Sequence, residues 1–293
     1  MAIGVFDSGI GGLTVLHALA AAMPRADIVY LADQANSPYG GRPGEEIVDL
    51  TQSGSARLFD AGCDLVVLAC NTAAAVALRR LQQTWLAGER ARRARPVNIL
   101  GLIVPTIEAA TGVSWNEALE HRSDKLEKLD ILGIFSTPAT AQSRVYEIEI
   151  AKRSDAVAVF SEPCATLARQ IEAGEPDEVL RPVVEAHVAA LTRRIGRPPD
   201  RAILGCTHYE IIADLFRAAL PPGTPIIHQP GATADALHRY LARHPEFVAG
   251  GRGARRFLTT GRGGPQNGLA ARFWGGPLDF EAAAPPRVAV VSR

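Results

Sequence analysis

The sequence predicts an α/β fold built on parallel sheets. Short apolar runs alternate along the chain with helical segments of about 10–15 residues, and this alternation is typical of βαβ units. With 293 residues, 47% of them hydrophobic and 21% charged, the chain can bury a core and is long enough for two domains. One unit occurs twice, at 65–78 and 202–212: an apolar run, a cysteine, hydrogen-bonding residues and then a helical segment.

The apolar runs give the expected strands. Each is rich in Val, Ile, Leu or Phe and ends in small or polar residues, as buried strands of parallel sheets do. In chain order we expect strands at 3–6, 28–33, 65–69, 98–105, 129–137, 156–163, 201–205 and 225–229. Between them we expect helices at 13–22, from 72 to about residue 85 and, as an exposed amphipathic helix, at 114–129.

Changes in composition predict how the chain divides. The segment 86–98 is rich in arginine and carries a proline near its end, so we expect a solvated crossover and a domain junction there. The expected first domain joins residues 1–97 to 207–293, and the expected second domain is 98–206. Glycine, proline and arginine become frequent from about 249, so we expect a mobile C-terminal tail, above all in its last ten residues.

Charge and cysteine content exclude several classes of protein. The net charge is zero and the pI is about 7.1, so nothing predicts binding to nucleic acid or to a membrane surface. The first residues show no basic region followed by an apolar run, so we expect no secretory signal. The most apolar stretch is interrupted by Asn71 and Thr72 and is too short to span a bilayer. Four cysteines in so long a chain do not make a disulfide scaffold. We therefore expect a cytoplasmic protein with reduced thiols.

Three loops gather polar groups where a ligand would bind. In open α/β sheets, ligands bind beyond the carboxyl ends of the strands. Three predicted strands are followed there by Asp7-Ser8, Cys70-Asn71-Thr72 and Cys206-Thr207-His208. Each loop leads into a predicted helix, whose unpaired N–H groups favour a carboxylate and lower the pKa of a thiol from about 8.5 towards neutrality. Both cysteines could therefore act as nucleophiles or as bases.

Other uses of these loops fit less well. The N-terminal glycine-rich run has Thr14 where a dinucleotide-binding loop needs its third glycine, and no phosphate-binding P-loop motif occurs. Cys206 and His208 lack the paired spacing of a zinc site, so we expect no metal. Cys63 and Cys164 have no polar followers and are expected to be buried and structural.

Two thiols on related elements fit one reaction class, the inversion of an acidic carbon. If Cys70 and Cys206 face each other across a cleft, one can remove a proton from one face of the carbon while the other returns a proton to the opposite face. Equivalent groups on both faces let the reaction run in either direction. Asp7 and His208 could each polarise or orient one of the thiols.

Five short motifs add a resemblance to a known family. They are FDSGIGGLTV, SPYGGR, ACNTA, LGCTHY and FLTTG. In this order they resemble the cofactor-independent glutamate racemases of the aspartate/glutamate racemase superfamily, over most of residues 1–275. The resemblance implies two similar α/β domains with the active site in the cleft between them, no cofactor, and a homodimer. It also implies that two thiols racemise L- and D-glutamate and supply D-glutamate for peptidoglycan.

The resemblance assigns roles to single residues. Cys70 would take the α-proton from D-glutamate, with Asp7 assisting nearby. Cys206 would take the α-proton from L-glutamate, with His208 assisting. The positions that match substrate-binding residues of the family are Asp7, Ser8, Pro38, Tyr39, Gly40, Asn71, Thr72, Thr137, Thr140, Cys206, Thr207 and His208.

The chain departs from the family pattern at several points, among them a longer charged segment at 114–129, and other functions stay open. Val104 and Arg262 stand where acidic residues are usual, and the order of residues around Cys164 is changed. The alternatives are a racemase for aspartate or another amino acid, a decarboxylase-like relative, and a non-catalytic regulatory protein on the same scaffold. The presence of both Cys70 and Cys206 favours a racemase over relatives that keep one cysteine.

Overall fold

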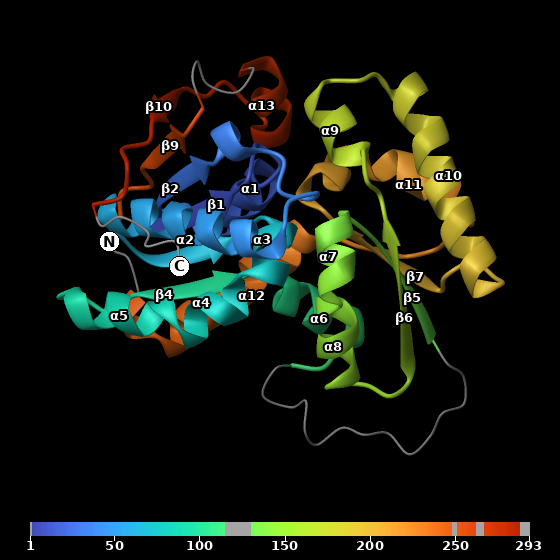
Figure 1. Cartoon of the computed structure of the whole chain (residues 1–293), viewed down its shortest axis with the longest axis horizontal. Helices are drawn as coiled ribbons and strands as arrows, with labels where there is room; N and C mark the ends of the chain where they lie inside the picture. Colours follow the sequence, from blue (N-terminus) through green and yellow to red (C-terminus); the bar gives the residue numbers. More distant parts are fainter. Residues whose placement is uncertain (1, 115–129, 248–250, 262–266, 288–293) are drawn as a thin grey trace.

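The computed structural model of the chain contains two parallel β-sheets flanked by helices (Figure 1), and it describes residues 2–114, 130–247, 251–261 and 267–287. The larger sheet has six strands in the order β10-β9-β2-β1-β3-β4, and the smaller has four in the order β6-β5-β7-β8. Every strand pairing among the described residues is parallel. The predicted α/β class with parallel sheets is therefore confirmed.

The strands follow the apolar runs of the sequence. They are β1 (Ala2–Asp7), β2 (Asp27–Ala32), β3 (Cys63–Leu68), β4 (Asn98–Gly101), β5 (Asp130–Ser136), β6 (Val157–Pro163), β7 (Arg201–Gly205), β8 (Ile226–Ile227), β9 (Arg255–Thr259) and β10 (Phe280–Ala282). The strand expected at 98–105 ends early, at Gly101, because Ile103 already begins helix α6. Strands β9 and β10 are missing from the prediction because β9 begins with two arginines and β10 has only three residues.

Helices connect the strands and cover both sheets. The α-helices are α1 (Leu13–Ala22), α2 (Gly44–Asp60), α3 (Asn71–Val76), α4 (Leu78–Gln83), α5 (Trp85–Arg92), α6 (Ile103–Thr111), α7 (Pro138–Ser143), α8 (Val145–Ala151), α9 (Leu167–Glu172), α10 (Asp177–Ile195), α11 (Ala213–Ala219), α12 (Gln229–Arg243) and α13 (Asn267–Trp274), and the 3₁₀ helices are η1 (Gln34–Asn36), η2 (Thr207–Ile212) and η3 (Pro245–Phe247). Within the described ranges, none of the helices is long and apolar enough to cross a bilayer. The helix expected at 114–129 lies, except for its first residue, outside the described residues.

The core of the larger sheet forms because its central strands are apolar on both faces. All six residues of β3 are buried, and in β1 only Ala2 is partly exposed. Such continuous apolar runs are expected where helices cover both faces of a parallel sheet. Helix α2 packs on β1 and β3, and α1 packs with α12 and α13. This core fixes the carboxyl ends of β1, where Asp7 lies, and of β3, which Cys70 follows.

The chain passes between the two sheets twice, through α6 and through α12. Strand β4 pairs with β3 in the larger sheet, and β8 pairs with β7 in the smaller. By strand pairing, the first crossing follows Gly101 and the second follows Ile227. Both crossings come later than the predicted domain boundaries at 97/98 and 206/207. The sequence placed the first boundary at a break in composition, whereas the backbone pairing that defines a sheet continues past it.

The arginine-rich segment 86–98 is a helix and a loop beside the larger sheet rather than the crossing itself. Helix α5 runs to Arg92, and the charges are used locally. Arg92 and Arg93 both bond to the buried carboxylate of Glu89, and Arg93 also bonds to Asp60. Composition alone suggests a domain junction here, because a sequence does not show whether an arginine pairs with a carboxylate or is solvated.

The described part of the C-terminal tail is attached to the larger sheet. Strand β10 pairs with β9 at the sheet edge, and the N–H of Ala283 extends this pairing with a bond of 2.8 Å. Arg57 of α2 then donates to the carbonyl oxygens of Ala283 and Ala284. These bonds hold the chain at Ala283 and Ala284 against the larger sheet. The mobility expected for the tail stays a prediction, and residues 288–293 lie outside the described residues.

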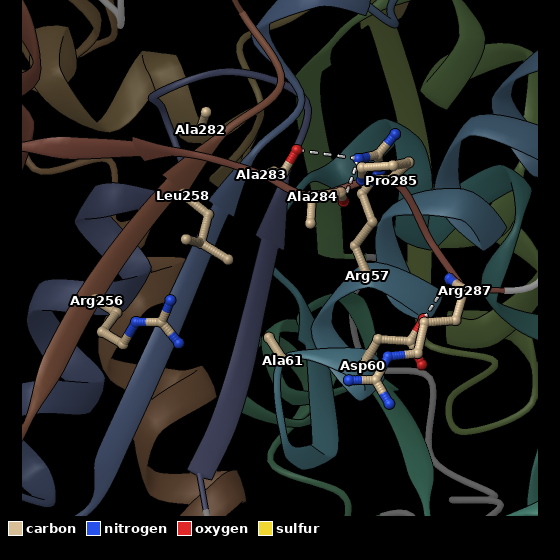
Figure 2. A pocket seen from close by; sticks show the side chains of 10 residues that line it. All are labelled: Arg57, Asp60, Ala61, Arg256, Leu258, Ala282, Ala283, Ala284, Pro285 and Arg287. Carbon is tan, nitrogen blue, oxygen red and sulfur yellow. Dashed lines mark hydrogen bonds between the residues drawn. The ribbon is translucent and has the colours of Figure 1, made fainter.

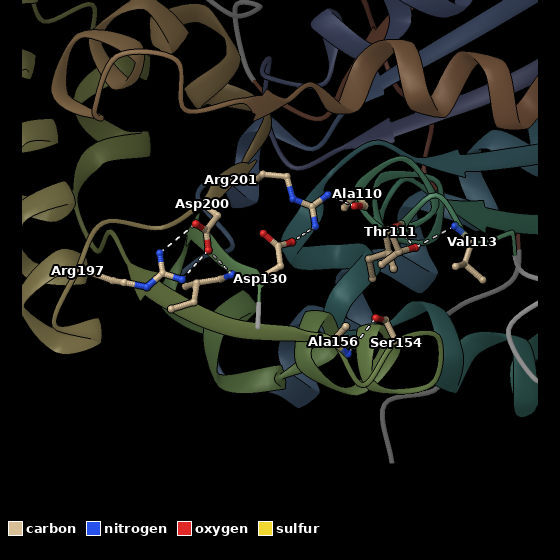
Figure 3. Close-up of polar contacts among 11 residues, drawn as sticks. Ala110, Thr111, Val113, Asp130, Ser154, Ala156, Arg197, Asp200 and Arg201 are labelled. Carbon is tan, nitrogen blue, oxygen red and sulfur yellow. Dashed lines mark hydrogen bonds and ion pairs between the residues drawn. The ribbon is translucent and has the colours of Figure 1, made fainter. Parts of the chain in front are cut away.

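Arg201, the first residue of β7, ties the start of the smaller sheet to the end of α6 (Figure 3). Its guanidinium pairs with Asp130 at the start of β5 and donates to the carbonyl of Ala110 in α6. One residue earlier, Asp200 accepts two bonds from Arg197, of 3.0 and 2.7 Å. These contacts hold the end of α6 beside the beginning of β5.

Gly54 in α2 and Gly88 in α5 give opposite predictions for the same substitution. A Cβ on Gly54 would lie 2.1 Å from the ring of Phe6 in β1. Gly54→Ala should therefore lower the free energy of unfolding by about 1–3 kcal/mol, the usual cost of overpacking a core. A Cβ on Gly88 would meet nothing within 4 Å, so Gly88→Ala should raise the free energy of unfolding by about 0.5–1 kcal/mol through helix propensity.

Urea unfolding of both variants measures the two changes. A stability of Gly54→Ala equal to or above that of the wild type would contradict the close packing of α2 on β1, and a loss in Gly88→Ala would contradict the open space at Gly88.

Candidate active site

The loops that follow four parallel strands meet between the two sheets. Asp7 ends β1 and Cys70 lies just beyond β3 in the larger sheet. Thr137 follows β5 and Cys206 follows β7 in the smaller sheet. Each residue therefore lies at the carboxyl end of its strand, where ligands of α/β proteins bind.

Two glycines mark how closely the halves of this region approach. A Cβ on Gly11 would lie 2.4 Å from Oγ1 of Thr207 and 2.6 Å from Nδ1 of His208. A Cβ on Gly40 would lie 2.7 Å from the Cβ of Thr137, and the carbonyl of Gly40 accepts the N–H of Ala139 at 3.0 Å. A side chain at either position would force its neighbours apart. The structure thus brings the polar loops of the two sheets into direct contact.

Cys70 is the N-cap of α3 and is only 5% exposed. Its Sγ accepts the N–H of Ala73 and donates to Oγ of Ser8, both at 3.4 Å. Burial and then the negative charge of Asp7 raise the pKa of the Cys70 thiol to about 11, although the hydrogen bonds with Ser8 and with the N–H of Ala73 oppose the rise. The expectation that the helix end lowers this pKa is wrong, because the N–H groups of the six-residue α3 do not offset the loss of water.

Cys206 lies at the matching point of the smaller sheet and is 6% exposed. Its Sγ is 3.7 Å from Nδ1 of His208. Burial raises the pKa of the Cys206 thiol well above its ordinary value, the N–H of His208 opposes this, and the charges of Cys70 and Asp7 add to it. Because ionisation of one thiol affects the other, Cys70 and Cys206 lie within electrostatic reach of each other. The expected lowering of the pKa is wrong here as well, for the same physical reason.

Asp7 and His208 each carry a buried polar atom without a hydrogen-bond partner in the described part of the chain. Oδ2 of Asp7 accepts the N–H of Gly9 at 2.9 Å, whereas its Oδ1 and the Nε2 of His208 have no such partner. Burial raises the pKa of the Asp7 carboxyl, and the attraction of His208 partly opposes this rise. Buried polar atoms are normally satisfied, so both atoms are suited to bind a ligand or exchange a proton.

Glu172, which the sequence analysis missed, also reaches this region. It is the last residue of α9, accepts bonds from Gln34 at 3.1 Å and Ser37 at 3.2 Å, and has Oε2 3.9 Å from Nε2 of His208. Its charge also raises the pKa of Asp7. In the sequence, Glu172 is an acidic residue two positions before a glycine that ends a helix. That pattern is also found at exposed helix ends, so it did not indicate a site residue.

Three buried threonine hydroxyls link the two sheets. Oγ1 of Thr72, after β3, lies 2.9 Å from Oγ1 of Thr137, after β5. Thr137 donates to Oγ1 of Thr140 at 3.0 Å, and Thr140 lies 3.4 Å from Thr72. The predicted Thr-x-x-Thr pair is therefore joined to the Cys70 loop. Hydroxyls both donate and accept, so the cluster can rearrange to bind carboxylate oxygens.

Pro38 and Tyr39 shape a turn rather than offer unpaired polar groups. Tyr39 is buried, and its hydroxyl donates to Oδ2 of Asp33 at 2.6 Å. Pro38 follows a cis peptide bond and is exposed. In this structure the turn reaches the other sheet through the backbone of Gly40, whose carbonyl is bonded as described above.

Asn71, next to Cys70, is held by a buried network. Its Oδ1 accepts the hydroxyl of Tyr146 at 2.9 Å and Nε2 of Gln229 at 3.0 Å, and its Nδ2 donates to Oε1 of Gln229 at 2.7 Å. All three side chains are buried. Tyr146 and Gln229 were not predicted, because nothing in the sequence relates α8 and the start of α12 to the loop after β3.

The remaining cysteines pack within the protein. Burial raises the pKa of the Cys63 thiol to about 12 and also raises that of Cys164. The thiol of Cys164 lies 3.6 Å from the carbonyl of Glu162, and its own carbonyl accepts the hydroxyl of Tyr209 at 3.2 Å. Across the described ranges, no three His, Cys, Asp or Glu side chains are grouped so that they could hold a metal ion.

A cavity of about 250 Å³ lies elsewhere, between α2 and the C-terminal segment (Figure 2). Its charged lining residues are Arg57, Asp60, Arg256 and Arg287. Arg57 bonds to the carbonyl of Ala284, Arg256 pairs with Glu281, and Asp60 accepts the N–H of Arg287. These charges hold the C-terminal segment, so the cavity does not mark the site formed by the strand ends.

Comparison with known proteins identifies the relatives of this chain. No protein-family model matches it. It is 72% identical over 283 residues to a glutamate racemase of Phenylobacterium zucineum, a match that covers 97% of this chain and 100% of the relative. It is 45% identical over 284 residues to a glutamate racemase of Paracoccus denitrificans, again covering 97% and 100%.

Solved structures agree with these matches. The crystal structure of glutamate racemase isoform RacE1 from Bacillus anthracis is similar with a TM-score of 0.81 at 30% identity, over 97% of this chain and 98% of that one. An aspartate racemase from Picrophilus torridus, 15% identical over 84% of this chain and 99% of that one, has a TM-score of 0.53 and shares the fold. Since its curated relatives match over nearly the whole length, the chain belongs to the glutamate racemase family.

Proposed function

We propose that the chain interconverts L- and D-glutamate with Cys70 and Cys206 as the two bases. The observation that supports this assignment best is the pair of buried thiols, each just beyond a strand of a different sheet and each within electrostatic reach of the other. Inversion at the α-carbon needs one proton acceptor and one proton donor on opposite faces. Two equivalent groups also allow both directions of the reaction.

The proton balance is complete with these two residues. From D-glutamate, the thiolate of Cys70 removes the α-proton, and the electron pair of the broken C–H bond stays on the carbon and spreads into the carboxylate. The thiol of Cys206 gives its proton to the opposite face. Cys70 ends as a thiol and Cys206 as a thiolate, which is the state that the reverse reaction requires.

Asp7, His208 and Glu172 control the charge around the thiols in this proposal. The anions favour protonated thiols, and a high pKa makes each sulfur a strong base once it is ionised. Nδ1 of His208 lies 3.7 Å from Sγ of Cys206. A protonated His208 would therefore stabilise the thiolate of Cys206. The ammonium group of glutamate would supply the positive charge that Asp7 and Glu172 attract.

Hydroxyl, amide and backbone N–H groups would orient the substrate carboxylates. Hydrogen bonds to ionised groups are short and strong, so several together can hold an anion tightly. We assign this role to Ser8, Asn71, Thr72, Thr137, Thr140 and Thr207. Tyr39 and Pro38 would support them through the turn at Gly40.

The proposal extends to the cell and to the assembly. We propose that the enzyme works in the cytoplasm and supplies D-glutamate for peptidoglycan, in keeping with its family. We also propose a homodimer. Light scattering should then give a mass close to twice the 31.2 kDa of the chain, whereas a mass of one chain at all concentrations would contradict this part of the proposal.

Replacing either thiol should abolish net racemisation. Cys70→Ser and Cys206→Ser should each lower kcat by roughly 10²–10⁴-fold, because a hydroxyl is a far weaker acid than a thiol. Circular dichroism measures racemisation, and NMR in D₂O measures exchange at the α-carbon. Cys63→Ser, which removes a buried thiol outside the assigned set, is the control. Full activity in either active-site variant, or exchange of aspartate without glutamate, would overturn the proposal.

The raised pKa of Cys70 gives a direction for the pH dependence. Only the thiolate removes a proton, and the pKa of about 11 means that most of the thiol is protonated near neutral pH. The thiolate fraction, and with it the rate from D-glutamate, should rise about tenfold per pH unit between roughly pH 7 and 9. Initial rates at each pH test this prediction. A rate that stays flat or falls over this range would show that another group limits the reaction.

A further inference from the structure

Gln229 connects the loops of both cysteines, although it is far from Cys70 in the sequence. It is the first residue of α12, where the chain leaves the smaller sheet for its second crossing. Its side chain is fully buried. A buried amide needs hydrogen-bond partners for its oxygen and its nitrogen, and those of Gln229 come from three other elements.

The side chain of Gln229 fixes the amide of Asn71, the residue next to Cys70. The two amides exchange a reciprocal pair of bonds, at 2.7 and 3.0 Å. Nε2 of Gln229 also lies 3.2 Å from Oγ1 of Thr106 and 2.9 Å from the hydroxyl of Tyr146, so its two N–H groups are shared among three acceptors. The hydroxyl of Thr106 is committed to the carbonyl of Leu102 at 2.7 Å. It can therefore only accept from Gln229, which fixes which end of the amide faces it.

The backbone of Gln229 is tied to the other cysteine loop. Its N–H donates to Oε1 of Glu210 at 3.0 Å, and Nδ1 of the preceding His228 lies 2.8 Å from Oε2 of the same carboxylate. Glu210 belongs to η2, the 3₁₀ helix that starts directly after Cys206. One residue thus contacts the Cys206 loop through its main chain and the Cys70 loop through its side chain.

We propose that Gln229 is a positioning residue for racemisation, which holds the Cys70 loop in register with the Cys206 loop. The proposal rests on the assigned roles of the two thiols. A proton acceptor and a proton donor on opposite faces of one carbon must keep their spacing, and misplacement by about 1 Å costs roughly 100-fold in rate. Gln229 also orients Asn71: among the described residues, Nδ2 of Asn71 donates to Gln229 alone, which leaves its second N–H to bind a substrate carboxylate.

The test is a double-mutant cycle between Gln229 and Asn71. Gln229→Met keeps the length of the side chain and removes its polar atoms, so kcat should fall about 10- to 100-fold in both directions. The double variant Gln229→Met/Asn71→Ala should have a kcat less than about twofold below that of Asn71→Ala alone, because Gln229 acts through Asn71. Thr233→Val is the matched control, since Thr233 is also buried on α12 and, among the described residues, its hydroxyl bonds within the helix, to the carbonyl of Gln229.

Melting temperatures separate positioning from folding. We expect Gln229→Met and Thr233→Val to lose similar stability while only the first loses kcat. Wild-type kcat in Gln229→Met, or losses that multiply fully in the double variant, would overturn the proposal. If the cysteine variants retained activity, the proposed function itself would fail. Inactive cysteine variants beside a fully active Gln229→Met would overturn only the role of Gln229.

Gln229→Glu gives a second measurement if the methionine variant does not fold. A protonated carboxyl has nearly the shape of the amide and keeps one donor, whereas the ionised form keeps none. The ratio of kcat between this variant and the wild type should therefore fall as the pH rises and the buried carboxyl ionises. A ratio that stays near one at every pH would contradict a positioning role.

Discussion

The fit between the two sheets is the constraint on which the whole site depends. Asp7 and Cys70 belong to the larger sheet, whereas Cys206 and His208 belong to the smaller, so neither sheet carries both thiols. Because Gly11 has no side chain, its backbone can lie directly against His208, which allows the two sheets to approach closely. The hydroxyl cluster of Thr72 and Thr137 and the amide network of Gln229 add hydrogen bonds to the same contact between the two sheets. Chemistry at the strand ends is therefore a property of the pair of sheets.

Burial decides the electrostatics of this contact. The N–H groups at the loop ends favour thiolates, yet the loss of water around Cys70 and Cys206 outweighs them, and the nearby carboxylate of Asp7 acts in the same direction. The protein therefore keeps both sulfurs protonated around neutral pH when the site holds no ligand. Oδ1 of Asp7 and Nε2 of His208, which have no hydrogen-bond partner among the described residues, mark where an incoming charge would be compensated.

The features that the sequence predicted correctly are those that depend on consecutive residues. The apolar runs of β1, β3, β5 and β7 predicted the parallel sheets, and the residues after them predicted the loops of Cys70 and Cys206, because strand ends and helix starts are written in consecutive residues. Glu172 and Gln229 could not be found in this way, since each reaches the site only through tertiary packing. The direction of the thiol pKa shifts was missed for the same reason, because burial is not visible in a loop motif.

The two contact glycines have a further consequence for how mutations in this enzyme are interpreted. A methyl group on Gly11 or Gly40 would act as a wedge between the halves, although neither position offers a side chain to any reaction. Such a variant would keep every acid and base and still lose the alignment on which turnover depends. Its kcat would fall as in a variant that lacks one of the thiols, although both thiols are still present.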